Sequence, residues 1–357
     1  MPTNGSSFQL IKELMDLQAT SGAEDQVRDY LKENIQDYVD EFITDGLGSL
    51  FGVKHAKKKD AQVVMVAAHM DEVGFMVESI KSNGLLSVVS LGGWNMQVVS
   101  AQRFTLQTEK GDYPIVSSSV PPHLLEDKNQ APNLSQISFD AGFSSKEEAE
   151  SFGVRPGDVI VPDVETIQMA ASSRILGKAF DNRYGMAMVI ELMRNTADLD
   201  LDYTLVAGAT VQEEVGLRGA KTAAELIKPD LFIAVDASPA ADTDGSKEAM
   251  GQLGEGFLVR VQDPGMLTPR KIVRWLVDLA EEHETNYQYY FAKGGTDAVA
   301  AQVAHTGIPS CVIGCPARYI HTHQSIFDMN DYEAAKEMIV TVIKDLDENK
   351  IKEFQTF

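Results

Sequence analysis

The stretch QVVMVAAHMD, residues 62–71, decides the fold that we predict for this chain. Its first seven residues form a short, almost continuously apolar run that is rich in valine. Such a run is typical of a strand that is buried on both faces, as in an α/β sheet. His69 and Asp71 follow at the carboxyl end of this strand, which is the end where open α/β sheets bind their ligands.

Helices and strands alternate over most of the remaining chain. The elements expected after residue 173 are a helix at 183–195, a strand at 203–211, a helix at 217–227 and a strand at 230–236. Between residues 73 and 162 the pattern changes to short β-like pieces separated by Gly, Pro, Ser and Asn clusters. The sequence therefore predicts an α/β fold with a discontinuous catalytic-type domain at 1–72 and 163–357. A small β-rich domain at 73–162 is inserted into it.

The composition limits the partners that this chain can have. Among its 357 residues, 31 Lys and Arg against 53 Asp and Glu give a formal net charge of −22. This acidity counts against binding to nucleic acid or anionic membrane surfaces, both of which need clustered basic residues. The N-terminal segment lacks the features of a secretion signal, and no apolar run is long enough to cross a bilayer. We expect a cytoplasmic protein whose two cysteines, Cys311 and Cys315, are buried thiols.

Polar residues that can carry chemistry stand at the ends of the expected strands and at nearby turns. They are His69, Asp71, Asp181, Glu213, Glu214, Asp236, His321 and His323. Imidazoles and carboxylates together form a set of nitrogen and oxygen ligands without a thiolate. Such a set suits zinc, cobalt or manganese in a catalytic site that keeps positions open for water and substrate.

The spacing of neighbouring candidate residues indicates which chemical role each can take. In His69-x-Asp71 both side chains lie on the same face of a strand, so Asp71 can accept the second imidazole hydrogen and fix the ring. Glu213 and Glu214 are adjacent, so their side chains diverge if the backbone is extended. One of them can then bind a metal while the other serves as a general base.

Each of these residues also has an ordinary structural explanation. A histidine at a strand end is often structural, an adjacent glutamate pair is usually a solvated acidic face, and an aspartate before a helix is usually an N-cap. The combination still favours a metal site, because four separate strand ends or turns each present a ligand type.

Six motifs make the sequence similar to a known family. In chain order they are HMDEVGFMV (69–77), GKAFDNRYG (177–185), VQEEVGLRGA (211–220), FIAVD (232–236), GGTDA (294–298) and ARYIHTH (317–323). With them the chain resembles the dinuclear-metal aminopeptidases that form tetrahedral dodecamers, most closely their bacterial glutamyl aminopeptidase branch. The resemblance covers essentially the whole chain. It implies a zinc-peptidase-like catalytic domain with a mixed sheet flanked by helices, and an inserted domain that takes part in oligomer contacts.

The resemblance implies two divalent metal ions per subunit, with zinc or cobalt expected and manganese as a third option. The implied ligands are His69, Asp181, Glu214, Asp236 and His321. Asp181 would bridge the two ions, with His69 and Asp236 completing one position and Glu214 and His321 the other. His323 is a second imidazole two residues further on, and we keep His321 as the ligand.

The resemblance also implies an activity, the metal-assisted hydrolysis of the first peptide bond of peptides with a free N-terminus. The enzyme would be a homo-oligomer, a tetrahedral dodecamer built from dimers, with Glu213 as the general base and Asp71 orienting His69. The glutamyl branch prefers N-terminal Glu or Asp, and Arg260 matches a position where that branch carries an arginine near the pocket. An arginine fork can bind a carboxylate through two parallel hydrogen bonds. Other basic residues near the motifs are Lys178, Lys293 and Arg318.

Other functions stay open at this point. A metal-dependent amidase or deacylase would not require a free amino group beside the cleaved bond, and an aminopeptidase of this kind can prefer neutral residues. A glycosidase is disfavoured, because its two carboxyl groups face each other across the sugar at roughly 5–9 Å, which adjacent glutamates do not easily do. An inactive metal-stabilised scaffold is disfavoured because it has little reason to keep a non-ligand acid such as Glu213. The role of the segment 294–297 stays open.

Overall fold

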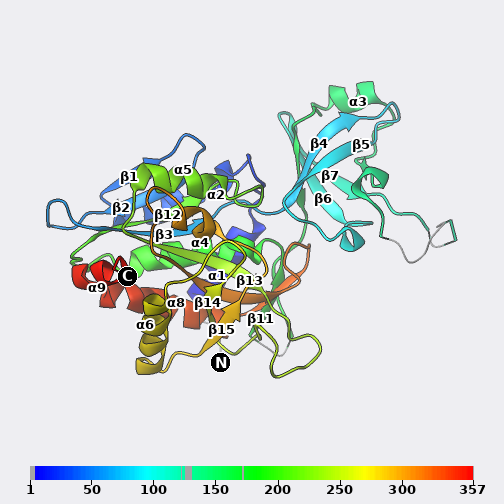
Figure 1. The fold of residues 1–357 in the computed structure, drawn as a ribbon. Helices are drawn as coiled ribbons and strands as arrows, with labels where there is room; N and C mark the ends of the chain where they lie inside the picture. Colours follow the sequence, from blue (N-terminus) through cyan, green and yellow to red (C-terminus); the bar gives the residue numbers. More distant parts are fainter. Residues whose placement is uncertain (1–4, 122, 125–130, 171–172, 357) are drawn as a thin grey trace.

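The larger domain of the molecule is built on one mixed sheet (Figure 1). The computed structural model describes residues 5–121, 123–124, 131–170 and 173–356, and within them this sheet is 11-stranded. Its strands are β1 Glu41–Thr44, β2 Leu50–Lys54, β3 Val63–His69, β10 Ile167–Gln168, β11 Arg174–Gly177, β12 Thr204–Thr210, β13 Leu231–Pro239, β14 Phe257–Gln262, β15 Tyr287–Phe291, β16 Ser310–Arg318 and β17 Ser325–Asp328. The main path runs β1-β2-β12-β3-β13-β16-β17-β11-β10, while β14 pairs with β16 and β15 pairs with β14.

The central strands β12, β3, β13 and β16 run parallel to one another. β3 is the strand predicted from the run at 62–68, and it is buried along nearly its whole length. His69 pairs with Thr210 on β12, and Asp236 pairs with Gly314 on β16. The polar residues at the carboxyl ends of these strands therefore meet at one edge of the sheet.

Helices cover both faces of this sheet. Their bounds are α1 Gly5–Asp16, α2 Asp25–Ile35, η1 Gln36–Tyr38, α4 Phe180–Asn195, α5 Arg218–Ile227, α6 Arg270–Glu282, α7 Asp297–Gln302, α8 Met329–Asp345 and α9 Glu348–Phe354. Val64, Val66 and Ala68 of β3 belong to a core that includes α1, α2, α4, α6, α8 and α9. Met65 and Ala67 point to the other face and pack in a core with α5 and α7. The predicted burial of β3 on both faces is confirmed by this alternation.

The β-rich segment forms a closed barrel in the order β4-β5-β8-β7-β6-β9. Its elements are β4 Gly74–Ile80, β5 Leu86–Leu91, η2 Met96–Val98, β6 Arg103–Thr108, β7 Gly111–Ser117, η3 Leu134–Gln136, β8 Phe139–Asp140, α3 Lys146–Ser151 and β9 Val159–Pro162. Phe75, Phe104 and Phe139 fill its core with ring centroids 5.0 to 5.7 Å apart. Figure 1 shows the barrel projecting from one side of the larger domain. The predicted fold class, an α/β domain with a small β-rich domain, is confirmed.

The hairpin of β1 and β2 has no counterpart among the predicted elements. β2 pairs antiparallel with β12, which makes this side of the sheet mixed. The sequence EFIT of β1 is short and half-exposed, so it gives too little periodicity to be recognised as a strand.

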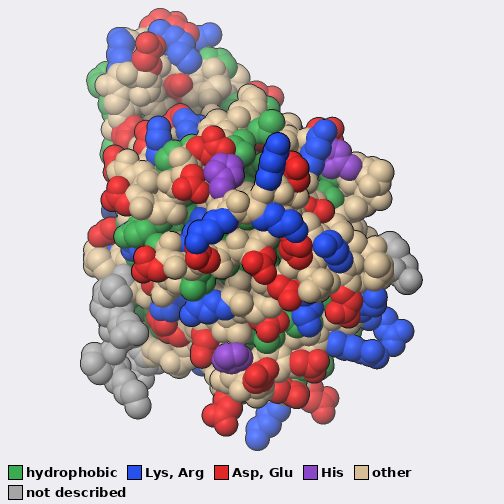
Figure 2. Space-filling view, turned by 90° about the vertical axis from the view of Figure 1, so that its left-hand side faces the viewer, with side chains coloured by type: hydrophobic (Ala, Val, Ile, Leu, Met, Phe, Trp, Pro, Cys, Tyr) green, Lys and Arg blue, Asp and Glu red, His purple; other side chains and the backbone are tan. Residues whose placement is uncertain are grey.

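The surface of the molecule carries charges of both signs. On the face shown in Figure 2, Lys and Arg side chains lie interspersed with Asp and Glu side chains. Among the described residues, no helix combines the length and the apolar character that crossing a membrane requires.

A buried ion cluster joins the end of β3 to the start of α4. Glu72 accepts hydrogen bonds through Oε1 from Lys178 Nζ at 2.6 Å and from Arg183 Nη2 at 3.1 Å. The three side chains are 0 to 2% exposed. Because Lys178 and Arg183 flank Asp181 in the sequence, this cluster fixes the segment that carries one of the predicted ligands.

Replacing Glu72 by glutamine is expected to lower the free energy of unfolding by about 3–5 kcal/mol, because the two buried cations would lose their charged partner and keep only neutral acceptors. Denaturant unfolding followed by circular dichroism measures this loss. Glu150→Gln is the control, since Glu150 is exposed and 3.8 Å from Lys146, and its loss should stay below about 1 kcal/mol. Equal losses in the two variants would show that the cluster does not stabilise the fold.

Candidate metal centre

The predicted ligands come together in one cavity of about 360 Å³ at the carboxyl edge of the sheet. The predicted site residues that line it are His69, Asp181, Glu213, Glu214, Asp236, Arg260 and His321. His69 ends β3, Asp236 lies on β13, and Asp181 lies in the first turn of α4. Glu213 and Glu214 follow β12, and His321 lies between β16 and β17. Five separate segments of the chain thus bring the five predicted ligands and Glu213 into this cavity.

Three groups of side chains in this cavity are close enough to hold a metal ion. They are His69 with Asp181 and Asp236, Asp181 with Glu214 and His321, and His69 with Glu213 and Glu214. In each group the ligand atoms lie within 4.8 Å of one another. The first two groups share Asp181, and together they contain the five ligands predicted from the sequence.

His69 presents an imidazole nitrogen to the carboxylates with its tautomer already set. Its Nδ1 lies 3.0 Å from the backbone oxygen of Asp71, and a carbonyl can only accept, so Nδ1 carries the hydrogen. Nε2 faces Asp181 Oδ1, 3.1 Å away, and Asp236 Oδ1, 3.6 Å away. Because carboxylate oxygens can only accept, these contacts require a cation between the groups, which is either a proton on Nε2 or a metal ion.

His321 repeats this arrangement on the other side of Asp181. Its Nδ1 lies 2.8 Å from the backbone oxygen of Gly93. Its Nε2 lies 3.3 Å from Asp181 Oδ2 and 3.5 Å from Glu214 Oε2. Each oxygen of Asp181 therefore faces a different imidazole.

The carboxylates of the cavity are crowded, and their side chains are only 4 to 12% exposed. Burial raises the pKa of Glu213 well above its usual range, raises that of Glu214 to about 8, and raises that of Asp236. Burial acts in the same direction on Asp181, but hydrogen bonds with the two imidazoles outweigh it and lower the pKa of Asp181. Glu214 Oε1 is buried without a hydrogen-bond partner in the described part of the chain. A nitrogen and oxygen set with excess negative charge and an unpaired oxygen fits divalent cations.

The backbone of residues 212–214 differs from the extended form assumed from the sequence. Glu213 lies in a loop and Glu214 begins a turn, so neither residue continues the strand that precedes them. The Asp71 carboxylate accepts the backbone N–H groups of Glu213 at 3.0 Å and Glu214 at 3.1 Å. His69 Nδ1 lies 3.5 Å from the carboxylate Oδ1 of Asp71 but only 3.0 Å from the backbone oxygen of Asp71. Asp71 therefore holds both the imidazole and the glutamate loop.

Two residues that the sequence analysis missed support the same loop. Glu24 accepts the backbone N–H groups of Gly22 at 2.8 Å and Gln212 at 3.1 Å, and burial raises its pKa to about 7. Ser21 donates its hydroxyl hydrogen to the Asp71 carboxylate. The only sequence signal is the run TSGAED, in which small polar residues follow a helix, and this run does not indicate a partner 188 residues away.

Among the basic residues considered near the motifs, Arg260 is the one that lines the cavity. It is 3% exposed, donates from Nη2 to Ser238 Oγ at 2.7 Å, and approaches Asp263 at 3.4 Å. Its Nε has no partner in the described part of the chain. Lys178 lies in the buried cluster, Arg318 forms two hydrogen bonds with Asp242, and Lys293 is exposed.

The remaining candidates are His323 and the segment 294–297. His323 points away from it, with Nε2 3.1 Å from the backbone oxygen of Arg103. Gly294 and Gly295 line the cavity, and Thr296 caps α7 by accepting the N–H of Ala298. Asp297 accepts a hydrogen bond from Thr210 at the end of β12.

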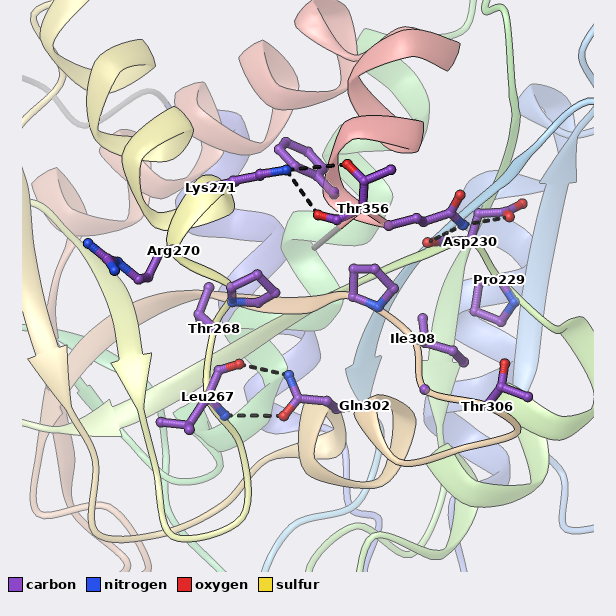
Figure 3. A pocket seen from close by; sticks show the side chains of 15 residues that line it. Pro229, Asp230, Leu267, Thr268, Arg270, Lys271, Gln302, Thr306, Ile308 and Thr356 are labelled. Carbon is purple, nitrogen blue, oxygen red and sulfur yellow. Dashed lines mark hydrogen bonds between the residues drawn. The ribbon is translucent and has the colours of Figure 1, made fainter.

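A larger cavity of about 790 Å³ lies elsewhere, between the start of α6 and the C-terminal helix (Figure 3). Lys271 donates there to the backbone oxygen of Thr356 at 2.9 Å, and Leu267 and Gln302 exchange two hydrogen bonds. The described residues that line it include a single acid, Asp230, and no histidine. It therefore offers no set of metal ligands.

Comparison with known proteins agrees with the six motifs. The profile described as M42 glutamyl aminopeptidase matches residues 48–338. A glutamyl aminopeptidase of Lactococcus lactis subsp. cremoris is 48% identical over 356 residues, which is 98% of this chain and 99% of the relative. The crystal structure of a TET aminopeptidase from a marine sediment Thaumarchaeota archaeon has a TM-score of 0.93 at 35% identity, with 98% of this chain and 99% of that chain covered. The Pyrococcus horikoshii TET1 peptidase, described as assembling into a tetrahedron or a large octahedral shell, has a TM-score of 0.86 at 26% identity, with 95% and 100% covered. The predicted resemblance is confirmed, and the chain belongs to the M42 family of glutamyl aminopeptidases.

Proposed function

We propose that this aminopeptidase uses two divalent metal ions and prefers N-terminal Glu and Asp. The observation that carries the proposal is the placement of Asp181 between two imidazoles. Its Oδ1 lies 3.1 Å from His69 Nε2 and its Oδ2 lies 3.3 Å from His321 Nε2. This is the arrangement expected of a carboxylate that bridges two cations.

His69, Asp181 and Asp236 would hold one ion, and Asp181, Glu214 and His321 the other. Zinc or cobalt suits this nitrogen and oxygen set, and manganese is a third option. When bound, the two ions would lower the pKa of water and polarise the scissile carbonyl.

Glu213 is the proposed general base. Its Oε2 lies 3.9 Å from His69 Nε2, and its backbone is fixed by the carboxylate of Asp71. Neither group that contains Asp181 needs Glu213 to complete it. Its carboxylate is thus free to take a proton from the attacking water and to return it to the departing amine. The free amine of the substrate would lie among the carboxylates of this cavity, which makes the enzyme an exopeptidase.

Arg260 is the proposed reader of an acidic substrate side chain. In a chain of net charge −22 such a preference needs a local cation, and Arg260 supplies one on the cavity wall. Ser238 orients its guanidinium, and Asp263 offsets part of its charge.

Arg260→Ala is expected to lower kcat/KM by roughly 10–100-fold for an N-terminal Glu amide, because a charged hydrogen bond contributes about 1.5–3 kcal/mol. For the Leu amide kcat/KM should change by less than about 3-fold. Arg318→Ala is the control, since Arg318 pairs with Asp242 and does not line the cavity. An equal loss on both substrates would make Arg260 a structural residue only.

We include in the proposal a homo-oligomer, a tetrahedral dodecamer built from dimers. The assembly described for the Pyrococcus horikoshii TET1 peptidase supports it. The division of the chain into residues 1–72 with 163–357, and 73–162, is supported by the closed barrel, whose strands all lie in the second part. Cys311 and Cys315 are buried free thiols, as predicted, and a cytoplasmic location is part of the proposal.

The test is hydrolysis of a matched set of chromogenic amides of Glu, Asp, Leu, Lys and N-acetyl-Glu. Each is assayed before chelation, after chelation, and after addition of cobalt or zinc. We expect metal-dependent cleavage of the Glu and Asp amides and none of the acetylated amide. Preference for Leu or Lys would remove the role given to Arg260, and cleavage of the acetylated amide alone would identify a metal-dependent amidase that needs no free amine.

A further inference from the structure

The inserted barrel reaches into the metal cavity through one loop. Residues 92–95 follow β5, and Gly93 and Asn95 from this loop line the cavity together with the predicted ligands. A segment of the inserted domain therefore forms part of the wall around the proposed ions.

This 92–95 loop contacts one ligand of a proposed metal position and leaves little space beside a second ligand of the same position. The backbone oxygen of Gly93 accepts the hydrogen of His321 Nδ1 at 2.8 Å. Gly92 has a φ of +86°, and a Cβ at this position would lie 3.2 Å from Glu214 Oε2 and 2.6 Å from Val73 Cγ1. His69, at the other position, takes its acceptor from the segment after β3 instead.

Aromatic packing holds the loop and the His321 segment together. The Trp94 ring stacks on Phe75 with centroids 5.0 Å apart, and its Nε1 donates to the backbone oxygen of Gly74 at 3.1 Å. His323 is 3% exposed, and its ring lies 4.5 Å from Phe104 and 5.7 Å from Trp94. Its Nε2 donates to the backbone oxygen of Arg103 on β6. The residue two positions after His321 is thus docked on the barrel.

We propose that the inserted barrel orients one ligand of the metal centre, His321. In this proposal His323 is a positioning residue that holds His321 against the 92–95 loop. The inference rests on the two-metal site proposed above. Loosening this contact should weaken the position formed by Asp181, Glu214 and His321. The position formed by His69, Asp181 and Asp236 should keep its affinity, because the barrel does not orient its imidazole.

The test is a cobalt titration of the metal-free, full-length protein by calorimetry and visible absorption. Wild type should bind two ions per subunit, and His323→Ala should weaken one binding step by roughly 10–100-fold while the other keeps its Kd. His323→Phe keeps a ring between Trp94 and Phe104, so it should restore most of the lost affinity. In both variants the backbone oxygen of Arg103 loses the hydrogen bond from His323 but still accepts the N–H of Asp163, so it is not left without a partner.

A matched pair of glycine variants tests the same contact from the barrel side. Gly92→Ala places a methyl group against Glu214 and Val73 and should weaken the same step. Gly142→Ala lies in the same barrel with a φ of +85° and nothing within 4 Å of the new Cβ, so it should bind cobalt as wild type does. Unchanged titrations of both His323→Ala and Gly92→Ala would overturn the inference, as would equal weakening of both steps in His323→Ala. Wild-type protein that binds no cobalt would instead overturn the proposed function.

Discussion

Glu213→Gln is expected to lower kcat by roughly 10²–10⁴-fold while the enzyme keeps its full complement of metal ions. Glutamine preserves the shape of the side chain but cannot take the proton of the attacking water. The two groups of ligands that share Asp181 stay intact in this variant. The measurements are kcat on the chromogenic Glu amide and metal content per subunit by mass spectrometry.

Glu214→Gln is the matched control, because it changes the adjacent residue in the same way. Glu214 Oε2 lies 3.5 Å from His321 Nε2, so this variant removes a proposed ligand. It should lose metal and activity together. Loss of metal in Glu213→Gln, with metal retained in Glu214→Gln, would show that the roles of the two glutamates are exchanged.

The second large effect is expected from Asp181→Asn. The two oxygens of Asp181 face two different imidazoles, one at each proposed metal position. The asparagine amide is neutral and has only one oxygen, so it cannot supply a ligand to both positions. Both ions should bind at least about 10²-fold more weakly, which exceeds the roughly 10–100-fold typical of losing a partner one step outside a metal site. Activity should fall to background at metal concentrations that saturate wild type. Cobalt titration of the metal-free variant measures both affinities.

Asp236→Asn separates a shared ligand from one that serves a single position. Asp236 belongs to the group with His69 and is absent from the group with His321. Its replacement should weaken mainly one binding step. An Asp181→Asn protein that still binds one ion with wild-type affinity would show that the two positions do not share this carboxylate.

The site residues at the strand ends could be predicted because the strands before them have a simple, continuously apolar sequence. Two of these strands, Val63–His69 and Leu231–Pro239, are buried along nearly their whole length. Their continuous apolar sequences predict this burial. Parallel pairing then brings their carboxyl ends to one edge, where His69 and Asp236 meet. The order of the six motifs identified the family, and the resemblance to that family implied the full set of ligands.

The contacts that orient the ligands could not be predicted in the same way. Glu24 reaches Gln212, and Gly93 reaches His321, across 188 and 228 residues of sequence. Hydrophobic periodicity describes neighbours along one element, so it carries no information on such pairs. The partner of Asp71 was also predicted incompletely, because the loop at Glu213 does not continue the strand before it.

The most direct test of the two-metal centre is anomalous X-ray diffraction from crystals of the zinc-loaded enzyme, recorded at the zinc edge. We predict two peaks in each subunit, one beside His69 and Asp236 and one beside Glu214 and His321, with Asp181 between them. A single peak, or peaks away from these side chains, would contradict the account.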